Sequence, residues 1–320
     1  MKRWLKKIAA IVVSVTLVSA CGGGDDPPGN LAQVAQQQGF TALVAAATKA
    51  NLVGALSDPA ASLTVFAPTD AAFGTLATQL GFANATAMVN ALPSSALASI
   101  LSYHVLPAKK TAATLVAGGA TQATIYNFAG SATTLALNTT GGVKITDAVL
   151  TQANVTTADV QASNGVIHVV DKVLVPPGVL TVVQMAQANP AAFSTLVSAV
   201  VSANLAGTLG GAGPFTVFAP TNAAFAAIAP TVASLTPPQL STVLTYHVLG
   251  SQVLSSGIPF GAPVATLSGQ SITINAGTAP VIATISDTTT TRANIAAVDV
   301  RASNGVIHVI SKVLLPNLAN

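Results

Sequence analysis

Residues 64–73 read Thr-Val-Phe-Ala-Pro-Thr-Asp-Ala-Ala-Phe, and residues 216–225 read Thr-Val-Phe-Ala-Pro-Thr-Asn-Ala-Ala-Phe. In both stretches a short apolar, β-forming run stops at a proline, and a threonine suited to cap a helix follows. The pattern predicts a strand that enters a helix through a proline corner, with Thr69 as the N-cap and Asp70 in the first turn. Because the stretch occurs twice, it also indicates a duplicated fold.

Three further blocks repeat in the same order. Residues 40–44 (Phe-Thr-Ala-Leu-Val) correspond to 193–197 (Phe-Ser-Thr-Leu-Val), residues 103–106 (Tyr-His-Val-Leu) recur at 246–249, and residues 162–169 (Ala-Ser-Asn-Gly-Val-Ile-His-Val) recur unchanged at 302–309. Equivalent blocks lie 140 to 153 residues apart, which is longer than the period of a solenoid repeat. Each copy is therefore expected to have its own core. The stretch Val175-Pro176-Pro177-Gly178 cannot continue a strand, which predicts domains over 31–177 and 178–320.

Each copy predicts an α+β domain. Apolar residues recur at helical spacing after Phe40 and after Phe193, and again over 94–103. From Thr111 onward, threonine, valine and isoleucine alternate with glycine turns, which predicts strands. The last two strands of each copy flank Asn164-Gly165 or Asn304-Gly305, and Asn-Gly is the strongest short-range hairpin signal.

The ordered set of these blocks resembles the fasciclin-like domain, present twice over roughly residues 30–177 and 179–317. The resemblance implies two α+β modules, each a wedge-shaped β-sandwich with surrounding helices, in an extracellular or cell-surface protein that mediates adhesion. It also points to Tyr103, His104, Tyr246 and His247 as a candidate interaction motif. The competing interpretation is that these side chains lock a helix end to the sheet through buried hydrogen bonds.

The first 21 residues have the layout of a secretory signal. Four basic residues lie within positions 1–7, an apolar run spans 8–20, and Cys21 follows. The cysteine resembles that of a bacterial lipobox, which predicts a lipoprotein signal peptide over 1–20, a lipid anchor on Cys21 and a flexible tether over 21–30. By resemblance to Gram-negative lipoproteins, the glycine after Cys21 favours export to the outer membrane. The alternative is an ordinary cleaved signal with a chance cysteine.

The composition excludes several classes of protein. With 51% hydrophobic and 7% charged residues, the chain is not expected to be intrinsically disordered. A single cysteine excludes an internal disulfide framework, a zinc ribbon and a cysteine-ligated cluster. After the signal, eight basic residues face nine aspartates and no glutamate, so no basic patch indicates a nucleic-acid partner.

The histidines are the residues best suited to metal binding or acid-base chemistry. All of them lie in the repeat blocks: His104, His168, His247 and His308. A metal or general-base pair in each module is one interpretation. A structural role is favoured, because no carboxylate or cysteine recurs near both members of a pair and zinc needs three or four ligands. We therefore expect no metal and no cofactor.

The aspartates give no stronger signal for catalysis. Asp70 is replaced by Asn222 in the second copy, which is not expected of a catalytic carboxylate. Asp147, Asp159 and Asp299 are interpreted as turn or strand-edge residues. No Gly-x-Ser-x-Gly, His-Glu-x-x-His or Gly-x-x-x-x-Gly-Lys motif is present. The sequence therefore predicts a protein that is not an enzyme.

Together these observations predict a non-catalytic surface lipoprotein with two fasciclin-like modules that mediates cell or extracellular-matrix adhesion. Its expected partners are the membrane, through the lipid on Cys21, and a surface protein or matrix component. The main rival is an apolar small-ligand carrier for a pigment or a lipid, since an alanine-rich interior could leave space between helices and sheet. A second rival is a hydrolase or a metal protein.

Overall fold

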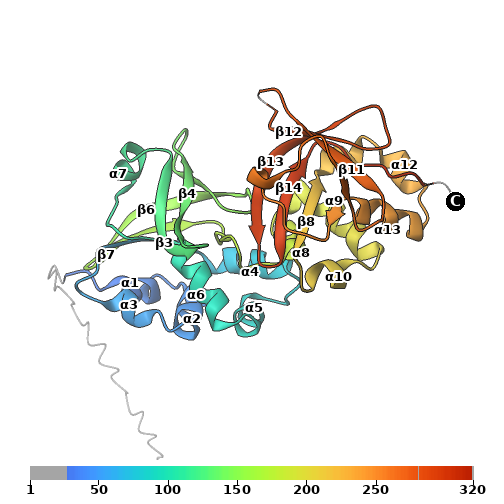
Figure 1. The fold of residues 1–320 in the computed structure, drawn as a ribbon. Helices are drawn as coiled ribbons and strands as arrows, with labels where there is room; N and C mark the ends of the chain where they lie inside the picture. The colour runs from blue at the N-terminus through green and yellow to red at the C-terminus, as the bar shows by residue number, and fades with distance from the viewer. Residues whose placement is uncertain (1–26, 280, 319–320) are drawn as a thin grey trace, which may run out of the picture.

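The structure, a computed structural model, describes residues 27–279 and 281–318. The predicted signal peptide, Cys21 and most of the predicted tether lie outside the described residues. Two modules lie side by side, the first within 31–177 and the second within 178–318 (Figure 1).

The first module begins with helices and ends with strands. Its helices are α1 (Leu31–Gln37), α2 (Thr41–Lys49), α3 (Val53–Ser57), α4 (Asp70–Gln79), α5 (Ala85–Ala91), α6 (Ser94–Tyr103) and α7 (Ala112–Ala117). Its strands are β1 (Leu63–Pro68), β2 (Val105–Leu106), β3 (Thr121–Phe128), β4 (Ser131–Asn138), β5 (Lys144–Thr146), β6 (Gln152–Ala162) and β7 (Gly165–Val170).

The second module repeats this order. Its helices are α8 (Val182–Gln187), α9 (Pro190–Ser202), α10 (Ala206–Gly210), α11 (Asn222–Ala226), α12 (Ala229–Ala233), α13 (Pro237–Tyr246) and the 3₁₀ turn η1 (Ser255–Gly257). Its strands are β8 (Phe215–Pro220), β9 (Val248–Leu249), β10 (Pro263–Ala265), β11 (Ser271–Ala276), β12 (Ala283–Ser286), β13 (Ala293–Ala302) and β14 (Gly305–Ile310).

The two sheets have the same topology, which confirms the duplication. The first is ordered β2-β1-β7-β6-β5-β4-β3, and the second β9-β8-β14-β13-β12-β11-β10. In each, one central pair is parallel, β1 with β7 and β8 with β14, and the other neighbours are antiparallel. The first sheet curls so that β3 approaches β2. Each module therefore joins a barrel-like sandwich sheet to helices, as predicted.

The proline corner forms as the sequence predicts. β1 ends at Pro68, the Thr69 side chain accepts a hydrogen bond from the Ala72 amide, and α4 begins at Asp70. Thr221 caps α11 in the same way. The corner fixes the direction in which the first sheet strand passes into the helical layer.

The prediction of strands and turns from Thr111 onward is wrong over 112–117, which form α7. Thr111 caps this helix by accepting a hydrogen bond from the Thr114 amide, and Leu115 is its one buried residue. A helix of only six residues leaves too little periodicity to be recognised in sequence. In the second module the 3₁₀ turn η1 stands at this position.

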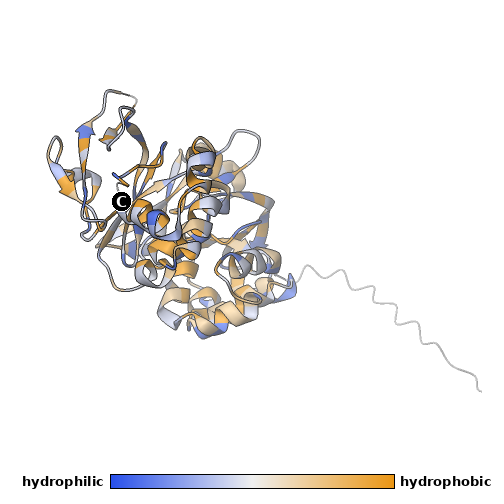
Figure 2. Cartoon of the chain, turned by 90° about the vertical axis from the view of Figure 1, so that its right-hand side faces the viewer, coloured by the Kyte–Doolittle hydropathy of each residue, from blue (hydrophilic) through white to orange (hydrophobic). Residues whose placement is uncertain are grey.

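The buried apolar side chains of the described residues form three clusters. One lies inside the first sheet, around Phe66 and Leu135, and one inside the second sheet, around Phe218 and Ile285. The third is the largest and lies beneath the helices, where it includes residues of both modules. The hydropathy colouring shows apolar residues along the helices of this layer (Figure 2).

No single helix among residues 27–279 and 281–318 has the length and apolarity needed to cross a bilayer. The helices α5 and α6 meet those criteria only as a pair, and they are bent by 117° relative to each other.

Candidate functional site

The first histidine of each module closes the helix that precedes the short edge strand. His104 is the C-cap of α6, and its Nδ1 lies 2.7 Å from the Ile100 carbonyl oxygen. Its Nε2 accepts a hydrogen bond of 2.8 Å from the Leu174 amide, so Nδ1 carries the proton. Burial lowers the pKa of His104 to about 4, because an imidazolium would lose its hydration there. Both ring nitrogens are therefore occupied in a neutral ring.

The second module repeats this arrangement. His247 Nδ1 lies 2.7 Å from the Val243 carbonyl oxygen, and the Leu314 amide donates to Nε2 at 2.8 Å. Burial likewise lowers the pKa of His247 to about 4. Each histidine ties the end of a helix to the segment that follows the last strand, since Leu174 and Leu314 lie four residues after the ends of β7 and β14.

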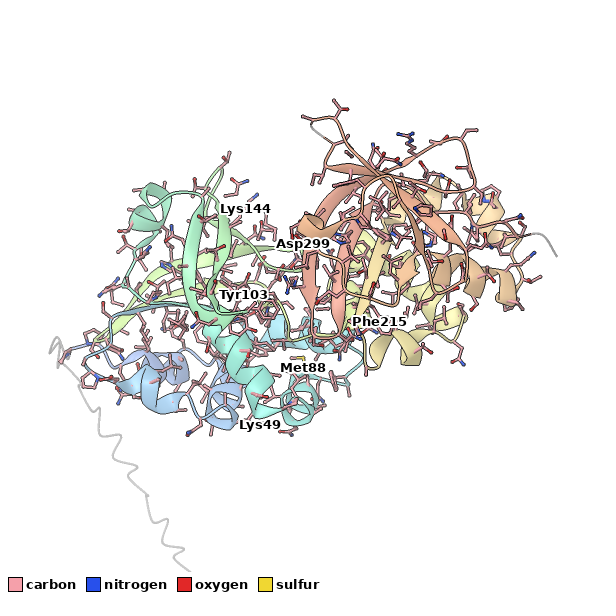
Figure 3. All side chains as sticks on the ribbon, viewed as in Figure 1. Lys49, Met88, Tyr103, Lys144, Phe215 and Asp299 are labelled. Atoms are coloured by element: carbon pink, nitrogen blue, oxygen red, sulfur yellow. The ribbon has the colours of Figure 1, made fainter. Side chains whose placement is uncertain are left out.

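The tyrosines before these histidines point inward. Tyr103 lies between α6 and the sheet (Figure 3), 2% exposed, with its hydroxyl 3.4 Å from the Thr134 carbonyl oxygen. Tyr246 is 1% exposed and donates to the Ser271 carbonyl oxygen at 3.0 Å. Burial raises the pKa of both tyrosines. The geometry supports a structural role for the Tyr-His pairs, whose part in partner binding stays a prediction.

The second histidine of each module sits at a β-bulge. His168 accepts a hydrogen bond at Nδ1 from the Asp159 amide, and its Nε2 lies 2.8 Å from the Lys110 carbonyl oxygen. Asp159 has a φ of +60°, in the left-handed region, where the register of β6 on β7 shifts. The carboxylate of Asp159 accepts from the Ala112 amide, whereas His168 is bonded by the Asp159 backbone amide. The pair is adjacent in space, yet it is not an acid-base dyad.

His308 and Asp299 form the equivalent pair. The Asp299 amide donates to His308 Nδ1, and Nε2 lies 2.9 Å from the Val253 carbonyl oxygen. The Asp299 carboxylate accepts from the amide and the hydroxyl of Ser255. Burial lowers the pKa of His308. His168 and His308 each lie against a phenylalanine of the parallel strand, with ring centroids 5.7 Å apart.

The predicted hairpins form, but the turn is not Asn-Gly. Ala162 pairs with Gly165, so Ser163 and Asn164 are the two loop residues. Gly165 begins β7, where a Cβ would lie 2.3 Å from the Leu63 carbonyl oxygen. The glycine is therefore required by the close approach of β1. Gly305 has the same restriction against Phe215.

The asparagine of each hairpin joins three segments. Asn164 is 2% exposed; its Oδ1 accepts from the Leu31 amide, and its Nδ2 donates to the carbonyl oxygens of Leu56 and Asp58. Asn304 bonds Val182, Leu209 and Gly211 in the same way. Sequence analysis missed this role, because partners 106 to 133 residues away in the first module leave no local pattern.

The exchange of Asp70 for Asn222 has a structural cause. Asp70 accepts hydrogen bonds from the hydroxyl of Thr41 and the amide of Ala42, at the start of α2. Asn222 accepts from the Thr195 amide and donates to the carbonyl oxygens of Pro190 and Ala191. Because α9 begins at Pro190, four residues before the position equivalent to the start of α2, the carbonyl oxygens of Pro190 and Ala191 lie beside residue 222, where an amide can donate to them and a carboxylate cannot. Asp70 is a remote cap of α2, whereas Asn222 bonds the first turns of α9.

Asp147 was predicted as a turn or strand-edge residue, and it is a buried turn anchor. It is 5% exposed and accepts from the amides of Val149, Thr151 and Val175 and the Thr151 hydroxyl. Burial raises its pKa to about 6, although these hydrogen bonds favour the charged form. Sequence alone does not give this burial, which depends on the approach of distant Val175.

The equivalent Asp287 is ion-paired. Lys312 Nζ lies 2.7 Å from its Oδ2 and 2.8 Å from the Thr291 carbonyl oxygen. Burial alone would raise the pKa of Asp287, but hydrogen bonds from Lys312, Thr289 and Leu315 hold it below its usual value. The lysine that corresponds to Lys312 in the first module is Lys172, which is exposed and forms no ion pair within the described residues.

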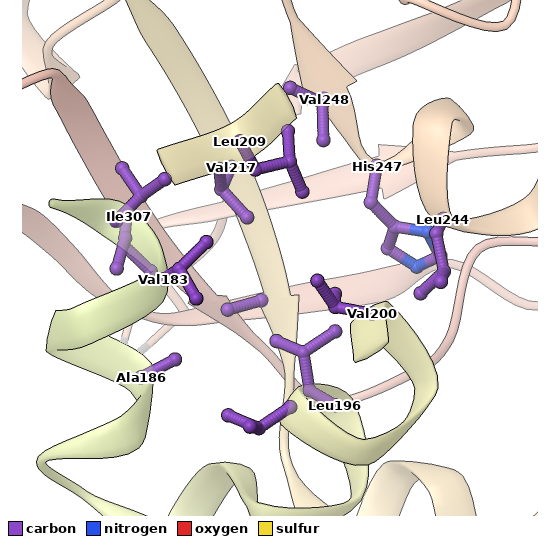
Figure 4. Close-up of a pocket in the computed structure, with 13 residues that line it drawn as sticks. Val183, Ala186, Leu196, Val200, Leu209, Val217, Leu244, His247, Val248 and Ile307 are labelled. Carbon is purple, nitrogen blue, oxygen red and sulfur yellow. The ribbon is translucent and has the colours of Figure 1, made fainter. Parts of the chain in front are cut away.

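Both modules contain the same apolar cavity. The cavity of the second module (Figure 4) lies between α8, α9, α10 and the sheet, and that of the first lies between α1, α2, α3 and the sheet. Each has a volume of about 40 Å³. The equivalent lining residues are Leu43 and Leu196, Val65 and Val217, Leu101 and Leu244, His104 and His247, and Ile167 and Ile307. The sequence predicted space between helices and sheet but not this position.

No group of three or more metal-ligating side chains occurs among the described residues. Each histidine is occupied by backbone groups, and each asparagine or aspartate described above serves a turn or a helix end. The repeated polar residues are therefore connections that hold helices to a sheet.

Comparisons with known proteins find one matching family and several relatives. The Fasciclin domain family matches the chain twice, over residues 38–176 and 191–316. Protein sll1483 of Synechocystis sp. is 44% identical over 142 residues, which are 43% of this chain and 74% of that protein. Cell surface glycolipoprotein MPB83 of Mycobacterium bovis is 36% identical over 142 residues, which are 42% of this chain and 60% of that protein. A solved FAS1 domain pair from the insect cell adhesion molecule Fasciclin I covers 88% of this chain and 95% of its own, with 18% identity and a TM-score of 0.42.

Proposed function

Because this chain belongs to the Fasciclin domain family, we propose that it is a non-catalytic surface lipoprotein that mediates cell or extracellular-matrix adhesion through its two modules. The observation that carries the proposal is the engagement of all four histidines with backbone groups inside the modules. A histidine with both nitrogens bonded in the core offers neither a metal ligand nor a general base. The function proposed for the modules is therefore to bind a partner through their outer surfaces.

The lipid anchor rests on the sequence and on one relative. Cys21 follows a basic segment and an apolar run, as in lipoproteins, and the similar MPB83 is named a cell surface glycolipoprotein. We propose that the acylated Cys21 holds the modules at the outer membrane or the cell surface. Anchoring at one end leaves both modules free to meet a surface protein or a matrix component.

Adhesion is tested on cells that lack the protein. We expect cells producing the full chain to aggregate or to bind matrix more than cells producing a chain without residues 31–320. A Cys21→Ser variant, which keeps both modules but not the anchor, should move from the membrane fraction to the medium and lose the effect. Equal aggregation and matrix binding with and without the modules would contradict adhesion, and a Cys21→Ser variant that stays in the membrane would contradict the anchor.

The twin cavities favour a second candidate function, the carriage of an apolar small ligand such as part of a lipid or pigment. The cavities are apolar apart from Gln36 and the imidazoles of His104 and His247. At about 40 Å³ each is smaller than the roughly 150 Å³ cavity that holds benzene, so a ligand needs the helices α1 or α8 to move outward.

This second candidate is tested by filling the cavities. Ala35 and Ala186 occupy equivalent lining positions, so Ala35→Leu with Ala186→Leu closes both. Organic extracts of the purified native protein should contain an apolar compound that extracts of the filled variant lack. Identical extracts from the two proteins would exclude carriage in these cavities.

A further inference from the structure

The two modules are connected by more than the chain between them. Asn189, which caps α9 in the second module, donates from Nδ2 to the Val149 carbonyl oxygen of the first module at 2.9 Å. Both residues are buried, at 6% and 2% exposed. Tyr126 of β3 donates its hydroxyl to the Pro177 carbonyl oxygen at 3.0 Å, which ties the linker to the first sheet. These bonds restrain the junction from two sides.

An arginine of the second module lies on an aromatic ring of the first. The Arg301 guanidinium is 5.3 Å from the centroid of the Phe128 ring. Its Nε is buried and has no hydrogen-bond partner, so the ring face compensates for part of the lost hydration. The Gly178 amide donates to the Arg301 carbonyl oxygen at 2.9 Å. Gly178 has a φ of +78°, and a Cβ there would lie 2.1 Å from the Phe128 ring, so this position requires glycine.

The loop 147–151 of the first module contacts the second module, and its equivalent, the loop 287–291, has no module beside it among the described residues. In the first module Asp147 and Val149 of the loop 147–151 are buried, and Lys172 is exposed without an ion pair within the described residues. In the second module Thr289 replaces Val149, and Lys312 binds Asp287 and Thr289. The loop of the first module thus has an apolar residue, Val149, where the second module contacts it. In the loop of the second module, Lys312, Asp287 and Thr289 bond one another.

We propose that a seam formed by Phe128, Val149, Gly178, Asn189 and Arg301 holds the two modules as one rigid unit. The shared cluster of buried apolar side chains continues across this seam. Modules within a chain move relative to each other unless their interface is large and apolar, and this interface combines buried apolar side chains of both modules with hydrogen bonds. The inference goes beyond adhesion itself: a partner gains from both modules only when its sites match their fixed spacing.

The seam is tested by measuring the distance between the modules. The mature chain with Cys21→Ser receives spin labels at Thr86→Cys on α5 and Thr208→Cys on α10, both exposed. Pulsed dipolar spectroscopy should give one narrow distance distribution. Arg301→Gln, which introduces the residue of the first copy (Gln161), should broaden that distribution at least twofold. Arg292→Gln is the matched control, since Arg292 is exposed and makes none of the seam contacts.

A second variant separates loss of the seam from loss of folding. Asn189→Ser keeps an oxygen that caps α9 but lacks the Nδ2 group that reaches the Val149 carbonyl oxygen. It should also broaden the distribution while the helix content stays unchanged. A broad distribution in the labelled parent would overturn the proposal. A narrow distribution that persists in both the Arg301→Gln and the Asn189→Ser variant would overturn it as well.

Discussion

Acidification from pH 7 to pH 4 is expected to unfold the second module before the first. The buried His104 and His247 weaken both modules equally over this range, because the pKa of each is about 4 in the folded state and about 6.5 in the unfolded state. The unfolded chain then binds a proton that the folded chain does not. Stability from each histidine is present above pH 6.5 and is lost as the pH falls to 4, by about 3 kcal/mol.

Asp147 and Asp287, which occupy equivalent positions, make the stability of the two modules respond differently to acid. Burial raises the pKa of Asp147 to about 6, so the folded first module binds a proton before its unfolded state does and gains stability as the pH falls from 6 toward 3.8. That gain, again about 3 kcal/mol, offsets the loss at His104. In the second module the pKa of Asp287 is lowered below 3.8, so this residue gives no stabilising gain between pH 7 and pH 4 and loses stability only at lower pH. The lowered pKa of His308 adds to the loss of stability as the pH falls below 6.5.

Module-resolved hydrogen exchange at pH 7, 6, 5 and 4, corrected for the intrinsic exchange rate, measures this difference. Protection of β8 and β14 should fall before that of β1 and β7. Asp147→Asn removes the offset and should make the first module as acid-sensitive as the second, whereas Asp58→Asn, at an exposed turn, should change nothing. Loss of protection in the first module before the second, or simultaneous loss in both, would contradict the expectation.

The sequence predicts the parts of this fold that depend on local chemistry. The corner at Pro68 and Thr69, the helix over 94–103 and the hairpin before Gly165 each follow from neighbouring residues, and their repetition shows that one fold occurs twice. The strand-to-helix geometry is set within a few residues, so a short stretch contains the information needed.

The roles of the polar residues could not be predicted in the same way. Asn164 bonds α1 and the segment after α3, Asp147 accepts from distant Val175, and Val149 accepts from Asn189 of the other module. These partners come together only when the tertiary structure forms. The cavities depend likewise on how three helices meet a sheet, and the seam on residues from both copies.

Replacing the hairpin asparagine is expected to give the largest loss of stability from a single substitution. Asn304→Ala removes three hydrogen bonds and leaves the Val182 amide and the carbonyl oxygens of Leu209 and Gly211 without that partner. Each bond contributes about 1 kcal/mol, and leaving a polar group of the buried residues Val182 and Leu209 unsatisfied costs more, so we expect a loss of about 3 to 5 kcal/mol. Asn164→Ala should have the same effect on the first module. The measurement is the denaturant midpoint, with hydrogen exchange to identify the module.

Asn304→Asp distinguishes a hydrogen-bonding role from a role in forming the turn. Aspartate is as good a turn residue as asparagine, and it keeps an oxygen for the Val182 amide. It places a second oxygen against the Leu209 and Gly211 carbonyls, however, so it should destabilise the module at least as much as Asn304→Ala. Ser303→Ala, in the other loop position, should cost less than about 0.5 kcal/mol. If Asn304→Asp were tolerated like Ser303→Ala, the asparagine would serve only the turn, and the attachment of α8 and α10 to the hairpin would have to come from apolar packing alone.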